Sequence, residues 1–208
     1  MPIQYTGLTR PIGIILACLM IAACAPRGMA PSAPPVATTD KALQAQAEAA
    51  YQKGELLTAL DYYQVLIQNF PDSPLIPQAF LKIGRIQTAL GDDLAALDSY
   101  QQLLAIYPER PEAMDARIEM LGALQRLGRN QEILDAAPAF ADQVQGDIRR
   151  FRLYTILGDA HAALAAWDQA VTFYDLAMTD APAIHRAALE EKMKTAVAML
   201  QEDQIELL

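Results

Sequence analysis

The chain has 208 residues, 53% of them hydrophobic, and its 25 acidic against 16 basic side chains give a formal net charge of −9. This is enough chain for one sizeable core, and the composition excludes a wholly disordered protein and argues against nucleic-acid binding as the main function. Alanine fills 38 positions and valine only five, so the composition favours an all-helical fold.

The first 24 residues differ from the rest of the chain. The apolar run from residue 11 to residue 21 is shorter than the roughly 20 residues of a membrane-spanning helix and has the length of a signal-peptide core. The tetrad Ile-Ala-Ala-Cys that ends at Cys24 resembles the lipobox of bacterial lipoproteins. By that resemblance, residues 1–23 are a signal peptide and Cys24 carries a lipid. An ordinary secretory signal, cleaved beside an unmodified Cys24, is the alternative.

Residues 24–39 are predicted to form the lipid anchor and a tether. Residues 25–39 contain four prolines and no acidic residue, and an extended linker of this kind spans about 3.1 Å per residue. Lipoprotein sorting, carried over by the same resemblance, keeps proteins with Asp after the lipidated cysteine in the inner membrane, whereas Ala25 follows here. We therefore expect an outer-membrane lipoprotein that faces the periplasm and is attached only by its N-terminal lipid.

From residue 40 onward the sequence repeats with an interval of 37 residues. One column of the repeat holds Gly54, Gly91, Gly128 and Ala165, and an earlier one holds Ala47, Gly84, Leu121 and Gly158. Later columns hold Tyr63, Tyr100, Ala137 and Tyr174, and then Pro71, Pro108, Gln145 and Pro182. Small residues where two helices approach, an aromatic residue on the second helix and a closing proline are typical of a helical hairpin.

These columns resemble the tetratricopeptide repeat, whose unit has about 34 residues. The resemblance implies an all-α fold: a right-handed superhelix of about four hairpins and a C-terminal capping helix. The hairpins are predicted at 40–71, 77–108, 114–145 and 151–182, and the capping helix at 183–202. Residues 40–208 would then form one repeat domain. The aromatic-Pro-x-x-Pro junctions at 70–74 and 107–111 resemble those of BamD-like outer-membrane lipoproteins.

The third unit departs from this pattern. Ile133 stands where alanine is expected, Ala137 replaces the aromatic residue, and Pro138 falls inside the predicted second helix. Proline removes a helical hydrogen bond, so we expect a kink or break near Ala137. Either the distortion shapes a partner site, or it is repeat drift that local repacking repairs.

The sequence contains no motif that indicates an enzyme, a metal site or a cofactor site. The near-neutral bases His161 and His185 fall in different units, the first expected in the core and the second in solvent. Trp167 is also expected to pack between helices. The adjacent acids Asp92 and Asp93 follow a turn glycine, where carboxylates favour a helix N-terminus. We therefore expect a non-enzymatic protein without cofactor, metal, small-molecule substrate or nucleic-acid partner.

The candidate site is a surface. In the tetratricopeptide family, the first helices of successive hairpins line a groove that holds a peptide or a partner's helix. By position, the resemblance assigns to this groove Gln44, Glu48, Tyr51, Gln78, Leu81, Arg85, Thr88, Ile118, Gln125, Arg126, Arg152 and Thr155, with Lys41, Gln52, Asp115 and Asp159 beside them. The arginines either form a locally basic face for an acidic or carboxylate-bearing partner or are solvated on separate faces.

The leading functional hypothesis is a lipid-anchored scaffold that binds another cell-envelope protein or peptide in outer-membrane assembly or envelope biogenesis. The alternative is a regulator of peptidoglycan synthesis, because the same features resemble the N-terminal repeat region of penicillin-binding-protein activator lipoproteins. Those proteins normally continue into a large binding-protein-like domain.

Overall fold

The computed structural model describes residues 39–144 and 148–206, in which every regular element is a helix. The prediction of an all-α fold is confirmed. The predicted signal peptide, the lipidation site Cys24, all of the tether before Thr39, and Gln145 lie outside the described residues. No helix in the described part of the chain is both long and apolar enough to cross a membrane.

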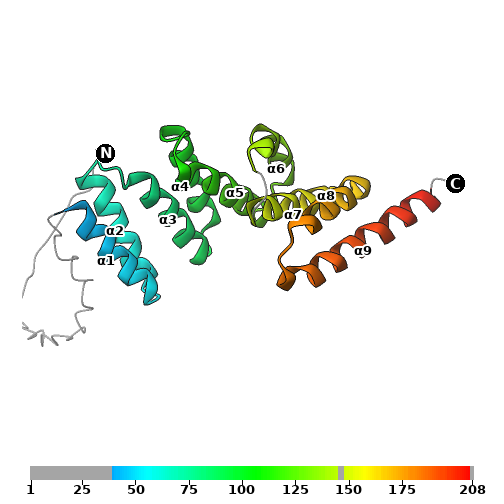
Figure 1. Cartoon of the computed structure of the whole chain (residues 1–208), viewed down its shortest axis with the longest axis horizontal. Coiled ribbons are helices and arrows are strands. Elements are labelled where there is room, and N and C mark those ends of the chain that lie inside the picture. Colours follow the sequence, from blue (N-terminus) through cyan, green and yellow to red (C-terminus); the bar gives the residue numbers. More distant parts are fainter. Residues whose placement is uncertain (1–38, 145–147, 207–208) are drawn as a thin grey trace, which may run out of the picture. The chain divides into compact units, whose positions relative to one another are not determined.

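Four hairpins follow one another along residues 40–180, and one long helix comes after them (Figure 1). The bounds are α1 (Asp40–Gln52) and α2 (Leu56–Asn69), α3 (Ile76–Ala89) and α4 (Asp93–Ile106), α5 (Pro111–Arg126) and α6 (Asn130–Ala136), α7 (Ile148–Ala163) and α8 (Trp167–Asp180), and α9 (Ala183–Glu206). Two short 3₁₀ helices, η1 (Ala137–Ala139) and η2 (Ala141–Gln143), follow α6. We refer to residues 40–206 as the repeat array.

The column of small residues between the two helices of each hairpin marks the turns. Gly54, Gly91 and Gly128 have φ angles of 77°, 82° and 70°, and Ala165 has a φ of 56°. Glycine adopts this left-handed conformation without steric cost, whereas for a residue with a Cβ the conformation costs roughly 1–2 kcal/mol. The fourth turn therefore keeps the geometry of the repeat despite its alanine.

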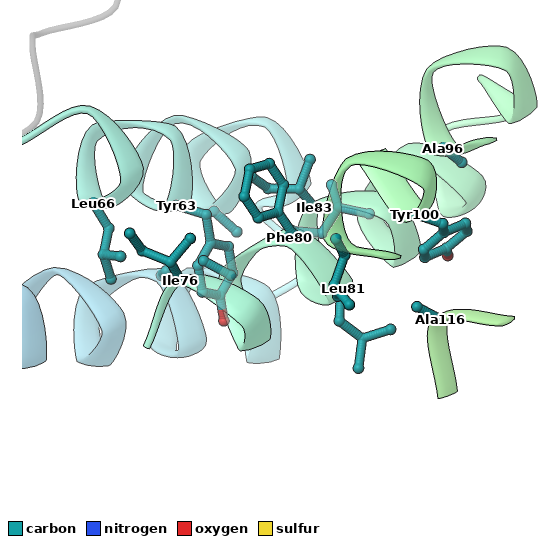
Figure 2. Packing of buried hydrophobic residues seen from close by; sticks show 14 of the residues in the cluster. Tyr63, Leu66, Ile76, Phe80, Leu81, Ile83, Ala96, Tyr100 and Ala116 are labelled. Carbon is teal, nitrogen blue, oxygen red and sulfur yellow. The ribbon is translucent and has the colours of Figure 1, made fainter. Parts of the chain in front are cut away.

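The earlier small column brings the two helices of a hairpin together. A Cβ on Gly84 would collide with the ring of Tyr100, and one on Gly158 would collide with Tyr174. In the first hairpin, Tyr63 stands in the repeat column of Tyr100 and Tyr174 and is 1% exposed. Figure 2 shows Tyr63 and Tyr100 directed into the interior with the neighbouring apolar side chains. The aromatic residue of each of these hairpins therefore fills space that a small residue leaves.

The third hairpin is broken where the sequence predicts it. The helix α6 ends at Ala136, and Ala137 and Pro138 begin the 3₁₀ helix η1. Leu121 and Ala137 occupy the columns that elsewhere hold a small residue and tyrosine, yet both side chains are fully buried. In this hairpin the large residue is on the first helix and the small one on the second, the reverse of the other hairpins. The core therefore stays filled.

The sequence pattern of the capping helix predicts an inward face of Ala187, Ala188, Met193, Ala196, Val197 and Leu200, and the structure bears this out only in part, with Val197 exposed. Ala196 is buried and Met193 half-buried, but Ala187 and Ala188 are exposed, and Leu189 is buried instead. The buried side chains of α9 belong to a cluster that includes Ala170, Tyr174 and Ala177 of α8. The main neighbour of α9 is α8, and α9 contacts α7 through His185 on Phe151 and Lys192 on Asp159.

Candidate protein-interaction face

Polar and charged side chains connect the first helices of successive hairpins. We call this set the first-helix face: Gln44, Glu48, Gln78, Lys82, Arg85, Asp115, Glu119, Gln125, Arg149, Arg152, Asp159 and Lys192. It extends over α1, α3, α5, α7 and α9. Most of its interactions join residues 33 or 34 positions apart, which is the offset between facing positions of neighbouring first helices.

Amide and ion pairs join α1 to α3. The side-chain amide of Gln44 donates to that of Gln78 at 2.8 Å, and Lys82 Nζ lies 2.8 Å from a carboxylate oxygen of Glu48. The same ammonium group lies 5.3 Å from the ring centroid of Tyr51, within cation–π range. Gln44 and Glu48 of α1 therefore pair with α3, and Tyr51 lies beside Lys82.

Glu119 is the centre of the face. Arg152 donates two hydrogen bonds to its carboxylate, at 3.1 and 2.9 Å, and Arg85 Nε donates a third at 3.2 Å. Burial alone would raise the pKa of Glu119, but the hydrogen bonds and positive charges of Arg152 and Arg85 outweigh it, and the pKa is lowered. Asp115 lies within 3.6 Å of Arg85 and Arg149. Three successive first helices thus share one charge network.

Asp159 is a second centre, nearer to the end of the array. Its carboxylate accepts hydrogen bonds from Gln125 of α5 at 2.7 Å, from the Tyr174 hydroxyl of α8 at 2.8 Å and from Lys192 of α9 at 2.6 Å. Burial, followed by the hydrogen bond to this carboxylate, raises the pKa of Tyr174. Asp159 therefore connects the last helix to the two hairpins before it.

Two predicted groove residues are not on the surface. Leu81 is 5% exposed and Ile118 is fully buried, and both belong to hydrophobic clusters of the core. They share a repeat column with Gln44 and Thr155, which are half-buried. This column lies at the border between face and core, so its apolar members pack inward. Thr155 donates its hydroxyl hydrogen to the Phe151 carbonyl of its own helix.

The arginines do not form a basic surface of unpaired cations. Arg85 and Arg152 bind Glu119, and Arg126 Nε donates to Asp93 at 2.7 Å while its Nη2 reaches Thr88 at 3.3 Å. The interpretation of a locally basic groove is therefore wrong: the face alternates in charge. Position in the repeat did not indicate Lys82, Glu119 and Lys192. The spacing of 34 residues between opposite charges such as Glu48 and Lys82 would have indicated them.

The histidines and Asp92, singled out in the sequence for possible chemical roles, contact other residues of the fold. His161 stacks on Phe173 with ring centroids 5.2 Å apart, and burial lowers the pKa of His161. His185 is exposed and lies 5.3 Å from the Phe151 ring. Asp92 caps α4 by accepting from the Ala95 amide, as its position predicted. Within residues 39–144 and 148–206, no group of His, Cys, Asp and Glu side chains could hold a metal.

The four hairpins have a tetratricopeptide-like fold. A family profile described as "Tetratricopeptide repeat" matches residues 41–73 and 78–110, which cover the first two hairpins except for Asp40, Ile76 and Pro77. These two segments are tetratricopeptide repeats. No curated protein sequence matches the chain significantly.

Solved structures show the same fold over most of the chain. MamA (residues 41 to the end) from Desulfovibrio magneticus RS-1 is 17% identical, covers 81% of this chain and 94% of its own, and has a TM-score of 0.63. BtubC from P. vanneervenii is 12% identical over 79% of this chain and 74% of its own, with a TM-score of 0.65. Nearly identical TPR-like repeats from Podosopora anserina are 18% identical over 81% and 91%, with a TM-score of 0.61.

Proposed function

We propose that the protein is a non-enzymatic, lipid-anchored scaffold that binds another cell-envelope protein or peptide on the first-helix face. The observation that carries the proposal is the charge network around Glu119. The network holds side chains of three first helices in fixed positions, and Arg85 and Arg152 remain 35% and 39% exposed. The tetratricopeptide fold supports protein binding as the mode of action.

The charge pattern indicates the chemistry of the partner. Paired arginines retain N–H groups beyond those that bind Glu119, and half-buried Gln44 and Gln78 offer further donors and acceptors. A partner segment with side chains of both signs would match the alternation better than a uniformly acidic one. Because these side chains are already ordered by one another, binding would cost little further side-chain entropy.

The setting that we propose is the periplasmic side of the outer membrane. It is supported by the lipobox that ends at Cys24, by the Pro/Ala-rich tether and by the junction pattern. In the structure, Phe70 and Tyr107 of the two junctions are the C-cap residues of α2 and α4, directly before Pro71 and Pro108. Within this setting, outer-membrane assembly is our first candidate role and regulation of peptidoglycan synthesis the second.

The test is site-specific photo-crosslinking in the native host. A photoreactive residue replaces Arg85 on the first-helix face, and the control replaces Ala105, which is exposed on α4. We expect the Arg85 position to capture an envelope protein that the Ala105 position does not. Barrel-assembly proteins would support the first role and cell-wall synthases the second. Equal capture at both positions, or capture at Ala105 alone, would overturn binding on this face.

A further inference from the structure

The second helices of the hairpins carry acidic side chains and no basic ones. Neither lysine nor arginine occurs in α2, α4, α6 or α8. The acids of these helices are Asp61, Asp93, Asp98, Glu132, Asp135, Asp168, Asp175 and Asp180. Arginines outside the second helices pair with Asp93, Glu132 and Asp180. The other acids form no ion pair within the part of the chain that the structure describes. The second helices therefore carry negative charge that the array does not neutralise.

A groove of about 350 Å³ lies between α2 and α4, over α3. Its floor is formed by Phe80 and Ile83, which lie one turn apart on α3 and are 9% and 5% exposed (Figure 2). The rest of its lining consists of Gln64, Ile67, Gln68, Gln87, Asp98, Ser99 and Gln102. None of the lining residues belongs to the first-helix face. The groove thus combines an apolar floor with a rim of amide groups and one carboxylate.

Ser99 leaves the groove open. This side chain is 6% exposed, and its hydroxyl donates to Gln87 Oε1 at 2.6 Å. The repeat column of Ser99 holds Tyr62 in the first hairpin and Phe173 in the fourth, where the ring stacks on His161. Serine is much smaller than either aromatic residue. The second hairpin therefore has free space where two other hairpins have a ring.

The groove also presents polar groups that the array does not use. Because Gln87 Oε1 accepts from Ser99, the amide nitrogen of Gln87 remains available as a donor. Asp98 accepts a hydrogen bond from the neutral Gln102 at 2.6 Å, which leaves its charge uncompensated. The two glutamines of α2 at the rim are exposed. Amide groups of this kind pair with the carbonyl and N–H groups of a peptide backbone, and the carboxylate pairs with a cation.

We propose that this groove binds a peptide segment of a partner protein in which a lysine or arginine lies next to an apolar side chain. The apolar side chain would cover Phe80 and Ile83, and the cation would pair with Asp98. The amide nitrogen of Gln87 would donate to a backbone carbonyl of the segment.

Charge selects this kind of partner. Asp61 stands on α2 in the repeat column of Asp98 and is likewise exposed, so both helices that border the groove offer an uncompensated carboxylate. The cations of α3, Lys82 and Arg85, form ion pairs on the first-helix face. A basic segment would therefore meet no unpaired cation of α2, α3 or α4. A second copy of the chain is disfavoured as the occupant, because each copy has a formal net charge of −9.

The first experiment selects a ligand from short random peptides displayed on phage. The bait is the full chain, purified in a non-ionic detergent. We expect the enriched peptides to contain lysine or arginine next to an apolar residue. Enrichment of peptides without such a pair, or no enrichment, would overturn the proposal. This selection involves no variant of the first-helix face, so either proposal can fail while the other stands.

The most enriched peptide is then synthesised with a fluorescent label and titrated by anisotropy against two matched variants. Asp98→Asn and Asp175→Asn each remove one exposed carboxylate from a second helix, but only Asp98 lines the groove. We expect Asp98→Asn to weaken binding about three- to tenfold and Asp175→Asn to change it less than about twofold. Equal effects would mean that only the overall charge attracts the peptide, and would overturn the proposal.

Ser99→Tyr tests whether the peptide occupies the groove. The variant introduces the ring that Tyr62 supplies in the same repeat column. We expect binding at least about tenfold weaker than that of the parent. The melting temperature shows whether the variant folds, and if it does not, the comparison of Asp98→Asn with Asp175→Asn decides alone. Unchanged binding by a folded Ser99→Tyr variant would place the peptide elsewhere and overturn the proposal.

Discussion

Single residues of the array are constrained by what faces them rather than by their type. Gly84 and Gly122 are both buried glycines inside first helices. A Cβ on Gly84 would enter the Tyr100 ring, whereas a Cβ on Gly122 would meet only the end of the Arg126 side chain, at 3.5 Å. The same substitution at the two positions should therefore change stability in opposite directions.

Gly84→Ala should lower the free energy of unfolding by about 1–3 kcal/mol, because the Tyr100 ring must move out of a filled core. Gly122→Ala should raise it by about 0.5–1 kcal/mol, since alanine is the better helix former. Urea denaturation of both variants measures the two effects. An equal decrease in the free energy of unfolding of both variants would mean that the contact with Tyr100 does not determine which residue position 84 tolerates.

Glu119 should make stability depend on pH. Its pKa in the folded protein is lower than the ordinary value of 4.5, so its contribution is present above about pH 4.5 and is lost as the pH falls through the folded pKa. Glu119→Gln should lower stability by about 1–2 kcal/mol at pH 7, since its arginine partners are still partly in water. The stability of the Glu119→Gln variant should then decrease less on acidification than that of the parent protein.

Melting temperatures at pH 7 and at pH 3–4 give the comparison, with the exposed Glu109→Gln as the control. Glu109→Gln should follow the parent at both pH values. If Glu119→Gln also followed the parent, the network around Arg85 and Arg152 would not contribute to stability.

At the scale of the elements, periodicity predicts most of the fold. The turn column locates all four hairpins, because a left-handed residue is needed at each turn, and Pro138 locates the break after α6. The rotation of α9 could not be predicted from its own composition. It depends on which neighbour packs against the helix, and alanines such as Ala187 and Ala188 are compatible with either face.

In the third hairpin, we can test whether the large Leu121 side chain fills the space that a tyrosine at position 137 would occupy. Ala137→Tyr should cost about 1–3 kcal/mol by overpacking, and Leu121→Ala about 2–5 kcal/mol by leaving a cavity. If the two side chains share one volume, the double variant should lose less than the sum, with a coupling of about 0.5–3 kcal/mol. Denaturant titrations of the four proteins in the cycle measure it. Additive losses would show that Leu121 does not occupy the space of the missing aromatic residue.

At the scale of the whole molecule, the candidate face was harder to predict than the fold. Gln44, Glu48, Arg85 and Arg152, which position in the repeat assigns to the groove, each contact a neighbouring first helix. Position in the repeat says nothing of pairing between helices, which depends on the offset between neighbouring hairpins. That offset brings Glu119 between two arginines, so that neither a basic face nor separately solvated arginines describes Arg85 and Arg152.

The predicted membrane attachment is tested at Cys24. Cys24→Ala removes the thiol that would carry the lipid, so the protein should move from the detergent phase to the aqueous phase on phase partitioning of cell extracts. Cys18→Ala, within the predicted signal peptide, is the control and should partition like the parent. An unchanged distribution of the Cys24 variant would contradict lipid attachment at this residue.

The brevity of α6 has a consequence for how the array opens. It has seven residues, against 14 in each of α2, α4 and α8, and so the fewest regular hydrogen bonds of any second helix. In a linear array whose units contact only their neighbours, such a unit separates two cooperative blocks. Amide hydrogens of residues 130–143 should exchange with deuterium sooner than those of α4 and α8, and the protein should come apart there before either block melts. Uniform exchange across the second helices would show a single cooperative unit.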